Sequence, residues 1–296
     1  MAANVFGSVS AIDKVAGVFV TRGPHLGAAA IAKQAREGLL QAGQELDAVA
    51  MPLGEPGSAA LLVRQIGGRV YQLEGRGLED GHFALLPDRS ALIDGSCIIH
   101  HSTRGVGEAL RSAAQRGATQ ALVLIPSDIR HDGGRGLVEV FGGAGEAATV
   151  PCPLVELSAV PLGQDPSREG HRHPFPWRGF CGRIEPAVPY LAALLGLEER
   201  IRRCEWVLAN TSRIGQPEDQ ALLDWLVPVT REAGRPLWVL VADVGREYQD
   251  LLKKWPVGLY PIAPGPLSIR QLERRERHLV RDAAHRLGIF MGGDPG

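Results

Sequence analysis

Short apolar runs alternate with longer stretches of helical spacing along much of the chain. Residues 15–20 (V-A-G-V-F-V) and 237–242 (L-W-V-L-V-A) contain no charged side chain, which is typical of strands buried on both faces. Loops containing Gly and Pro separate several of these runs from helix-forming stretches. The pattern predicts strands at 15–20, 47–51, 121–125, 206–209 and 237–242, and helices at 28–42, 58–66, 106–116, 187–203 and 218–233, the last kinked or divided by Pro228.

The clearest helix in the sequence is the last one. Ser268 can cap its start, and Gln271 stands at the reciprocal position of a capping box. One face is apolar and the opposite face carries arginines: Ile269, Leu272, Leu279, Val280, Ala283, Ala284 and Leu287 against Arg274, Arg277 and Arg281. Strands that alternate with helices imply a parallel sheet covered by helices, so we predict an α/β fold.

The pattern changes in the middle of the chain. Short strand-like runs at 69–74, 82–86 and 91–94 are separated by turns rather than by helices. Residues 143–186 are rich in Gly and Pro and predict loops or a poorly ordered excursion. We therefore predict two lobes with a cleft between them: a discontinuous α/β core of residues 1–70 and 205–296, whose two segments share one sheet, and a middle lobe of residues 71–204.

Charge and composition exclude several classes of function. Lys and Arg number 32 against 33 Asp and Glu, and a net charge of −1 gives no broad basic surface for nucleic acid or anionic lipid. No apolar run is long enough to span a membrane, and no secretory signal is visible at the start. The four cysteines lie far apart in sequence, which favours reduced thiols in a cytoplasmic protein.

Three loops that follow predicted strands could carry chemistry: residues 21–27, 52–58 and 127–136. The third is the most specific, because Asp132 stands beside Gly133 and Gly134, whose bare backbone could approach a ligand. Such amides can hold a phosphate, and the carboxylate could bind Mg²⁺ or accept a proton from a substrate hydroxyl. The alternative is a tight strand-to-helix turn with Asp132 as its cap.

Several familiar sites are absent from the sequence. It contains no G-x-x-x-x-G-K-[ST] loop, no G-x-S-x-G elbow and no complete dinucleotide fingerprint. The histidines at 100–101 and at 171 and 173 have neither helical spacing nor nearby carboxylates, so we predict no metal site.

The order of the loops resembles the bacterial type-2 glycerate kinase family over residues 15–288. Residues 103–108 (T-R-G-V-G-E) are similar to the family's T-x-G-x-G-E helix start, and residues 127–136 keep Ser127 and D-G-G of its G-G-S-A-T-N-D-G-G-A-G loop. Residues 209–216 (A-N-T-S-R-I-G-Q) stand where the family has T-G-E-G-R-x-D-x-Q. Residues 263–268 (A-P-G-P-L-S) are similar to its V-P-G-P-M-S, which also precedes a long helix.

The departures from the family pattern fall on charged residues. The first loop lacks the family's lysine, and the second lacks its aspartate. Thr211 and Gly215 replace a glutamate and an aspartate of the fourth loop, the family's D-V-x-N-P-L segment is missing, and the chain is shorter than usual. Each lost charge would cost on the order of 2–4 kcal/mol of transition-state stabilisation, or roughly 30- to 1000-fold in rate.

The resemblance implies a glycerate kinase-like fold and ATP-dependent phosphorylation of glycerate or a similar small hydroxy acid, with Mg²⁺ and ATP required. It implies that Asp132 is the remaining acid and that Arg213 neutralises phosphate. Substrate or phosphate would contact Ser127, Thr103, Gly133, Gly134 and Glu55, the last in place of a lost carboxylate. We expect Asp132, Arg213 and the 52–58 loop to line one cleft. The missing charges predict weak or lost activity, and the alternative is a non-catalytic paralogue that acts as a binding or scaffolding module.

Overall fold

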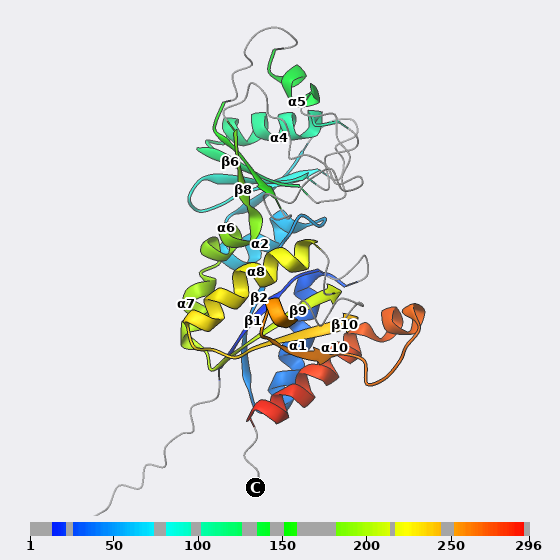
Figure 1. Ribbon diagram of the computed structural model, residues 1–296. Helices are drawn as coiled ribbons and strands as arrows, with labels where there is room; N and C mark the ends of the chain where they lie inside the picture. The colour runs from blue at the N-terminus through cyan, green and yellow to red at the C-terminus, as the bar shows by residue number, and fades with distance from the viewer. Residues whose placement is uncertain are drawn as a thin grey trace, which may run out of the picture.

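The strands of the molecule form two separate sheets (Figure 1). The computed structural model describes residues 14–21, 26–73, 81–95, 102–125, 135–142, 151–158, 182–213, 217–243 and 252–292. The fold is α/β, as the alternation of apolar runs and helical stretches predicts.

The first sheet is five-stranded and entirely parallel. Its order is β11 (Gly258–Pro261), β10 (Leu237–Asp243), β9 (Trp206–Arg213), β1 (Lys14–Phe19) and β2 (Glu45–Ala50). The prediction that the runs at 15–20 and 237–242 share one sheet is therefore confirmed, with β9 between them. β9 extends past its predicted end at residue 209, because its ladder with β10 continues to the pair of Arg213 and Asp243.

The second sheet is six-stranded and mixed. β3 (Arg69–Gln72), β4 (His82–Leu85) and β5 (Ser90–Asp94) pair antiparallel. β5, β6 (Gln120–Ile125), β7 (Leu154–Ser158) and β8 (Gly182–Pro186) pair parallel. Its strands come from residues 69–186, and those of the first sheet come from both sides of that range. The domain boundaries near residues 70 and 205 stay a prediction.

Helices cover both faces of the five-stranded sheet. α1 (Ala28–Gln41) and α10 (Ile269–Gly292) pack on one face, where Phe19, Leu208 and Leu240 meet their buried side chains. The opposite face meets four helices: α2 (Ser58–Ile66), α6 (Ala187–Leu194), α7 (Leu197–Arg203) and α8 (Pro217–Glu232).

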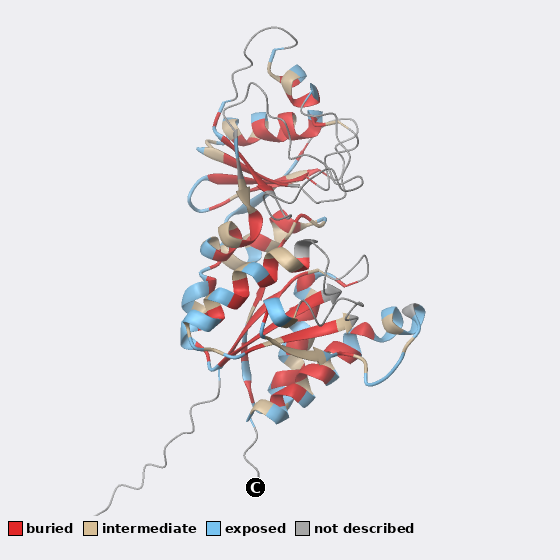
Figure 2. Ribbon diagram, viewed as in Figure 1, coloured by how far each residue is buried: buried red, intermediate tan, exposed pale blue. Residues whose placement is uncertain are grey.

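One hydrophobic cluster joins the two sheets. It contains Val18 and Val207 of the five-stranded sheet, Leu92 and Leu122 of the six-stranded sheet, and residues of the four helices between them. Figure 2 shows buried residues continuing from one sheet to the other through these helices. The far face of the six-stranded sheet is covered by α4 (Arg104–Gln115) and α5 (Arg135–Val140). Burial on both faces explains why the central stretches of β1, β6 and β10 are continuous apolar runs.

The structure corrects two sequence predictions about elements, narrows a third and adds a strand. Residues 143–186 are not loops throughout, because β7 forms within that stretch and β8 at its end. The predicted helix at 187–203 is two helices, since Gly196 adopts a left-handed conformation (φ +64°) between α6 and α7. Pro228 does not divide α8, which runs unbroken through it, and the predicted kink at this residue stays a prediction. β11 was not predicted, because its four residues make a short strand at the sheet edge.

The capping box predicted for the last helix is present. The Gln271 backbone N–H donates to Ser268 Oγ at 3.3 Å, and the Ser268 N–H donates to Gln271 Oε1 at 2.9 Å. Beyond this start, Leu279, Val280 and Ala283 are buried on the predicted apolar face. Among the described residues, no helix is long and apolar enough to cross a membrane.

Replacing Ser268 with alanine should loosen the first turn of α10. The change removes one acceptor for orphan helix amides and should cost about 1 kcal/mol. Hydrogen exchange of the amides at 270–273 should quicken several-fold, while exchange in the buried second half of α10 stays unchanged. Ser268→Thr keeps the hydroxyl and serves as the matched control. Equal exchange in Ser268→Ala and the wild type would contradict a stabilising cap.

Candidate functional site

The carboxyl ends of the five parallel strands lie at one edge of the sheet. Val20 and Thr21 follow β1, residues 51–58 follow β2, and β9 ends with Asn210, Thr211 and Arg213. Ligands of open α/β sheets bind at this edge. The first, second and fourth of the loops compared with the glycerate kinase pattern thus start from adjacent strands.

Glu55 ties the second loop to the first. Its Oε1 accepts a hydrogen bond from the Thr21 hydroxyl at 2.5 Å, and its Oε2 accepts one from the Leu53 N–H at 2.8 Å. Thr21 Oγ1 in turn accepts the N–H of Ala28, the first residue of α1, at 3.1 Å. Both carboxylate oxygens therefore brace the loops from within. That Glu55 contacts substrate or phosphate, in place of a carboxylate that the family pattern has and this chain lacks, stays a prediction.

Asp94 connects the second loop to the other sheet. It is the last residue of β5 and is fully buried, and its Oδ2 accepts a hydrogen bond from the Gly57 N–H at 2.8 Å. Gly57 is the N-cap of α2 and adopts φ +89°. Glycine has no side chain that could accept a hydrogen bond from the amides of the first turn. A carboxylate at a helix N-terminus is favourable, because it faces the positive end of the helix dipole. His82 Nε2 lies 3.8 Å from the same oxygen.

Asn210 joins the ends of β1 and β9. Its Oδ1 accepts the Val20 N–H at 2.8 Å, and its Nδ2 donates to the Val20 carbonyl at 3.0 Å. The buried amide thus satisfies both backbone groups of Val20 and extends the ladder by one side chain. It fixes the start of the first loop beside the residues that end β9.

The sequence analysis assigned no site role to Asp94, Asn210 or the buried Thr211. A signal existed for Asp94, since a carboxylate ends the apolar run A-L-I-D and is followed by glycine. Asn210 stands inside the motif compared with the family, but at a position where the family has glycine. Its pairing with Val20, 190 residues away in sequence, is visible only in the fold.

The structure does not place all the predicted site residues. Asp132, Ser127, Gly133 and Gly134 lie outside the described residues, as does the rest of the 126–134 segment. The predicted cleft shared by Asp132, Arg213 and the 52–58 loop is therefore untested and stays a prediction. Arg213 is the last residue of β9 and stands in register with Asp243 of β10.

Thr103 is described and fully buried at the start of α4. Its Oγ1 accepts the N–H of Leu137, in α5, at 3.0 Å. In this contact the hydroxyl joins two helices of the second lobe. A role in substrate binding stays a prediction for this residue.

The comparison with solved structures gives the fold a name. No family model matches the chain, and no curated protein sequence matches it. A protein from Salmonella typhimurium LT2, provisionally named glycerate kinase 2, superposes with a TM-score of 0.70 over 95% of this chain and 99% of that chain. The chain has a glycerate kinase fold. Sequence identity over the match is 13%, so the likeness concerns the fold.

Within this glycerate kinase fold, the sequence motifs stand at the ends of regular elements. Residues 103–108 are the N-cap and first residues of α4, residues 209–213 end β9, and residues 263–268 precede α10. The family resemblance predicts the α/β architecture with a second lobe, and the structural match confirms that architecture.

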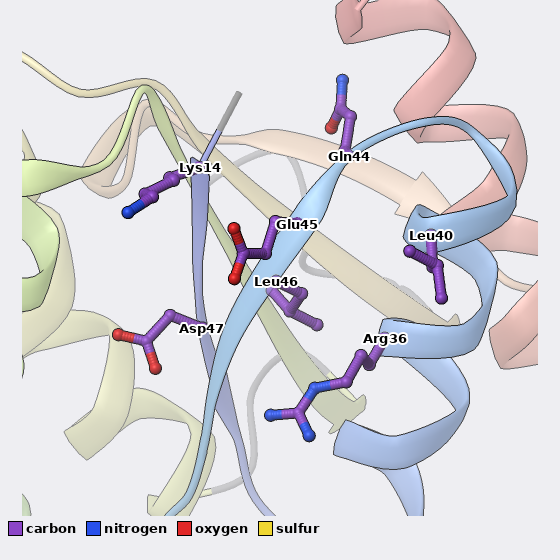
Figure 3. Close-up of a pocket in the computed structure, with 7 residues that line it drawn as sticks. All are labelled: Lys14, Arg36, Leu40, Gln44, Glu45, Leu46 and Asp47. Carbon is purple, nitrogen blue, oxygen red and sulfur yellow. The ribbon is translucent and has the colours of Figure 1, made fainter. Parts of the chain in front are cut away.

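A groove lies at the amino ends of β1 and β2, whereas these loops follow the carboxyl ends of the strands (Figure 3). It has a volume of about 550 Å³ and mixed charge, with the lining residues Lys14, Arg36, Leu40, Gln44, Glu45, Leu46 and Asp47. The basic and acidic side chains partly neutralise one another, and Asp47 also pairs with Arg200. The groove contains none of the residues at the carboxyl edge, which remains the candidate site of the glycerate kinase fold.

The described cysteines and carboxylates form no metal centre. No group of three or more His, Cys, Asp or Glu side chains suited to a metal ion occurs in the described part of the chain. Burial raises the pKa of the Cys152 and Cys204 thiols, which keeps them protonated and poorly reactive. The two histidine pairs considered from the sequence lie outside the described residues.

Proposed function

We propose that this protein catalyses slow, ATP-dependent phosphorylation of glycerate or a similar small hydroxy acid. The glycerate kinase fold, matched over 95% of the chain, supports the proposal. A second support is that the first and second loops are held together by hydrogen bonds at the carboxyl edge of the sheet, which favours an organised site.

The proposed reaction transfers the γ-phosphoryl group of ATP to a substrate hydroxyl. The oxygen of that hydroxyl forms the new P–O bond, the bond to the β-phosphate bridging oxygen breaks, and ADP leaves. In this proposal Asp132 accepts the hydroxyl proton and Arg213 neutralises phosphate charge, while Gly133 and Gly134 shape the loop around the phosphates.

Mg²⁺ would enter with the nucleotide as part of the MgATP substrate. The described carboxylates at this edge do not form a ligand set, since Glu55 braces its own loop and Asp94 is buried against Gly57. Kinase sites commonly hold Mg²⁺ through substrate phosphates and one or two carboxylates. No step is assigned to a protein-bound ion.

Slow turnover follows from the charges that are missing. With neither the lysine of the first loop nor the carboxylates of the second and fourth, less developing charge is neutralised in the transition state. Each loss corresponds to roughly 30- to 1000-fold in rate.

An ADP-release assay with D-glycerate and MgATP tests the proposal. We expect slow release that depends on glycerate and falls at least tenfold in Asp132→Asn, which keeps the size of the side chain but removes its charge. Arg277→Gln, on an exposed stretch of α10, is the matched control and should retain the wild-type rate. If ADP release is absent or does not depend on glycerate, the proposed kinase activity is refuted. The alternative, a non-catalytic binding or scaffolding module, then remains.

A further inference from the structure

Thr211 carries a buried hydroxyl without a hydrogen-bond partner. The residue is 0% exposed, and its Oγ1 has no hydrogen-bond partner among the residues that the structure describes. It belongs to the end of β9, one residue after Asn210, which anchors the start of the first loop. An orphan hydroxyl therefore stands at the carboxyl edge, where the candidate site lies.

The register of the sheet gives the face on which Thr211 lies. Side chains alternate along a strand, so Thr211 shares a face with Val207 and Ala209, which both belong to the cluster between the two sheets. In the neighbouring strand, Thr211 stands in register with Val241 of the same cluster. The hydroxyl thus replaces an apolar group at the last position of an apolar row, on the side that faces the second lobe.

Packing alone does not explain a threonine here. Valine has the same shape and would bury no polar atom, whereas an unpaired buried hydroxyl lowers stability. Polar groups that stay unpaired inside a native protein call for a functional explanation. The other four described orphans differ: Gln44 and Arg235 are bonded through a second polar atom of the same side chain. Trp206 begins β9 at the opposite end of the strand, and His285 belongs to α10 and is half-buried rather than buried.

We propose that the Thr211 hydroxyl donates a hydrogen bond to an oxyanion of the bound substrates. The inference rests on the proposed function and adds a residue to it. The oxyanion is either the carboxylate of the hydroxy acid or a phosphate of the nucleotide, because both present oxygens that accept from a hydroxyl. Because Thr211 is 0% exposed in this structure, the proposal requires the packing around it to open as the oxyanion enters, and binding then gives its hydroxyl a partner.

In this role, a neutral hydroxyl takes the place of a charged side chain at position 211. Thr211 stands where the family resemblance has a glutamate, and a neutral donor at that position cannot bind a metal ion as a carboxylate does. It can still bind an anion, for which a glutamate would be repulsive. Thr211 therefore favours ligand binding over fast phosphoryl transfer.

Thr211→Val and Thr211→Ser test the inference on the full chain. Without ligand, Thr211→Val should melt a few degrees higher than the wild type, because an unpaired polar group is removed. Calorimetric titrations with D-glycerate alone and with MgADP alone then form two arms. Thr211→Val should weaken binding about 10- to 100-fold in one arm only, which identifies the carboxylate or the phosphate as the partner. Thr211→Ser keeps the hydroxyl and should bind within threefold of the wild type.

The outcomes separate this inference from the proposed function. Wild-type binding that Thr211→Val leaves unchanged in both arms overturns the role of Thr211 and spares the proposed function. Wild-type protein that binds neither D-glycerate nor MgADP refutes the proposed function, and the role of Thr211 falls with it. A loss of binding in Thr211→Val together with a raised melting temperature supports the inference, since a damaged fold would melt lower.

Discussion

Asp94→Ala is expected to lower the free energy of unfolding by about 3 kcal/mol, because removing a buried carboxylate leaves the groups that contact it unsatisfied. Asp94 is fully buried, its Oδ2 accepts the Gly57 N–H, and His82, 24% exposed at its side chain, lies beside it. Truncation would leave the Gly57 amide without this acceptor and take a carboxylate from the N-terminus of α2. Urea denaturation followed by circular dichroism measures the loss as a lower midpoint.

A graded set of variants isolates the hydrogen bond. Asp94→Asn keeps an oxygen that can accept the Gly57 N–H, so it should lose less than half as much stability as Asp94→Ala. Asp282→Ala removes an exposed carboxylate that pairs with Arg281 and should change stability by no more than about 0.5 kcal/mol. A urea midpoint for Asp94→Ala equal to that of the wild type would show that the contact between β5 and the second loop contributes nothing to stability.

The effect of Asp94 should extend to the site. Its bond to Gly57 links the six-stranded sheet to a loop that starts in the five-stranded sheet, and Glu55 in the same loop bonds to Thr21. These contacts form a path from one sheet, through the second loop, to the first loop. Displacement of Gly57 is therefore expected to disturb both loops at the carboxyl edge.

Strands buried on both faces were predictable from sequence, whereas short edge strands were not. The runs that became β1 and β10 contain no charged residue over six positions, and burial leaves them few alternatives. β8 (G-R-I-E-P) and β11 (G-L-Y-P) carry no such pattern. They exist because a neighbouring strand supplies hydrogen-bond partners, and that pairing is a property of the fold rather than of the segment.

The sequence shows which polar residue types and loops follow the predicted strands, but it does not show which of these residues pair. A carboxylate after a buried strand is visible in the sequence, and so is a loop rich in Gly and Pro. The partners are not: Gly57 and Asp94 are 37 residues apart, and Val20 and Asn210 are 190 apart. The same limit explains Thr211, whose lack of a partner follows only from the packing around it.

The fold persists at 13% identity because its stability comes mainly from apolar clusters. Any apolar residue of suitable size can fill such positions, so identity can decline while the pattern of burial stays. The lysine and carboxylates that the family resemblance leads one to expect do not belong to these clusters. Under the proposed function, the absence of these charges lowers the rate and leaves the fold intact, so activity and stability have to be tested separately.

Gly38→Ala is expected to destabilise the protein by about 2 kcal/mol, although alanine is the better helix former. A Cβ at Gly38, in α1, would lie 2.1 Å from the carbonyl oxygen of Arg281 and 2.9 Å from the backbone nitrogen of His285, both in α10. These are backbone atoms, so no side-chain rotation relieves the clash, and the two helices have to move apart. Overpacking of this kind costs typically 1–3 kcal/mol or more, which exceeds the gain of about 1 kcal/mol in helix propensity.

Thermal denaturation of Gly38→Ala should show a midpoint about 3 °C lower than that of the wild type. Gly265→Ala is the matched control, because a Cβ there meets nothing within 4 Å and the backbone is not in the left-handed region. That variant should be unchanged or slightly stabilised, since alanine restricts the unfolded chain. If Gly38→Ala instead melts at or above the wild-type temperature, the close contact between α1 and α10 does not constrain this position, and helix propensity dominates.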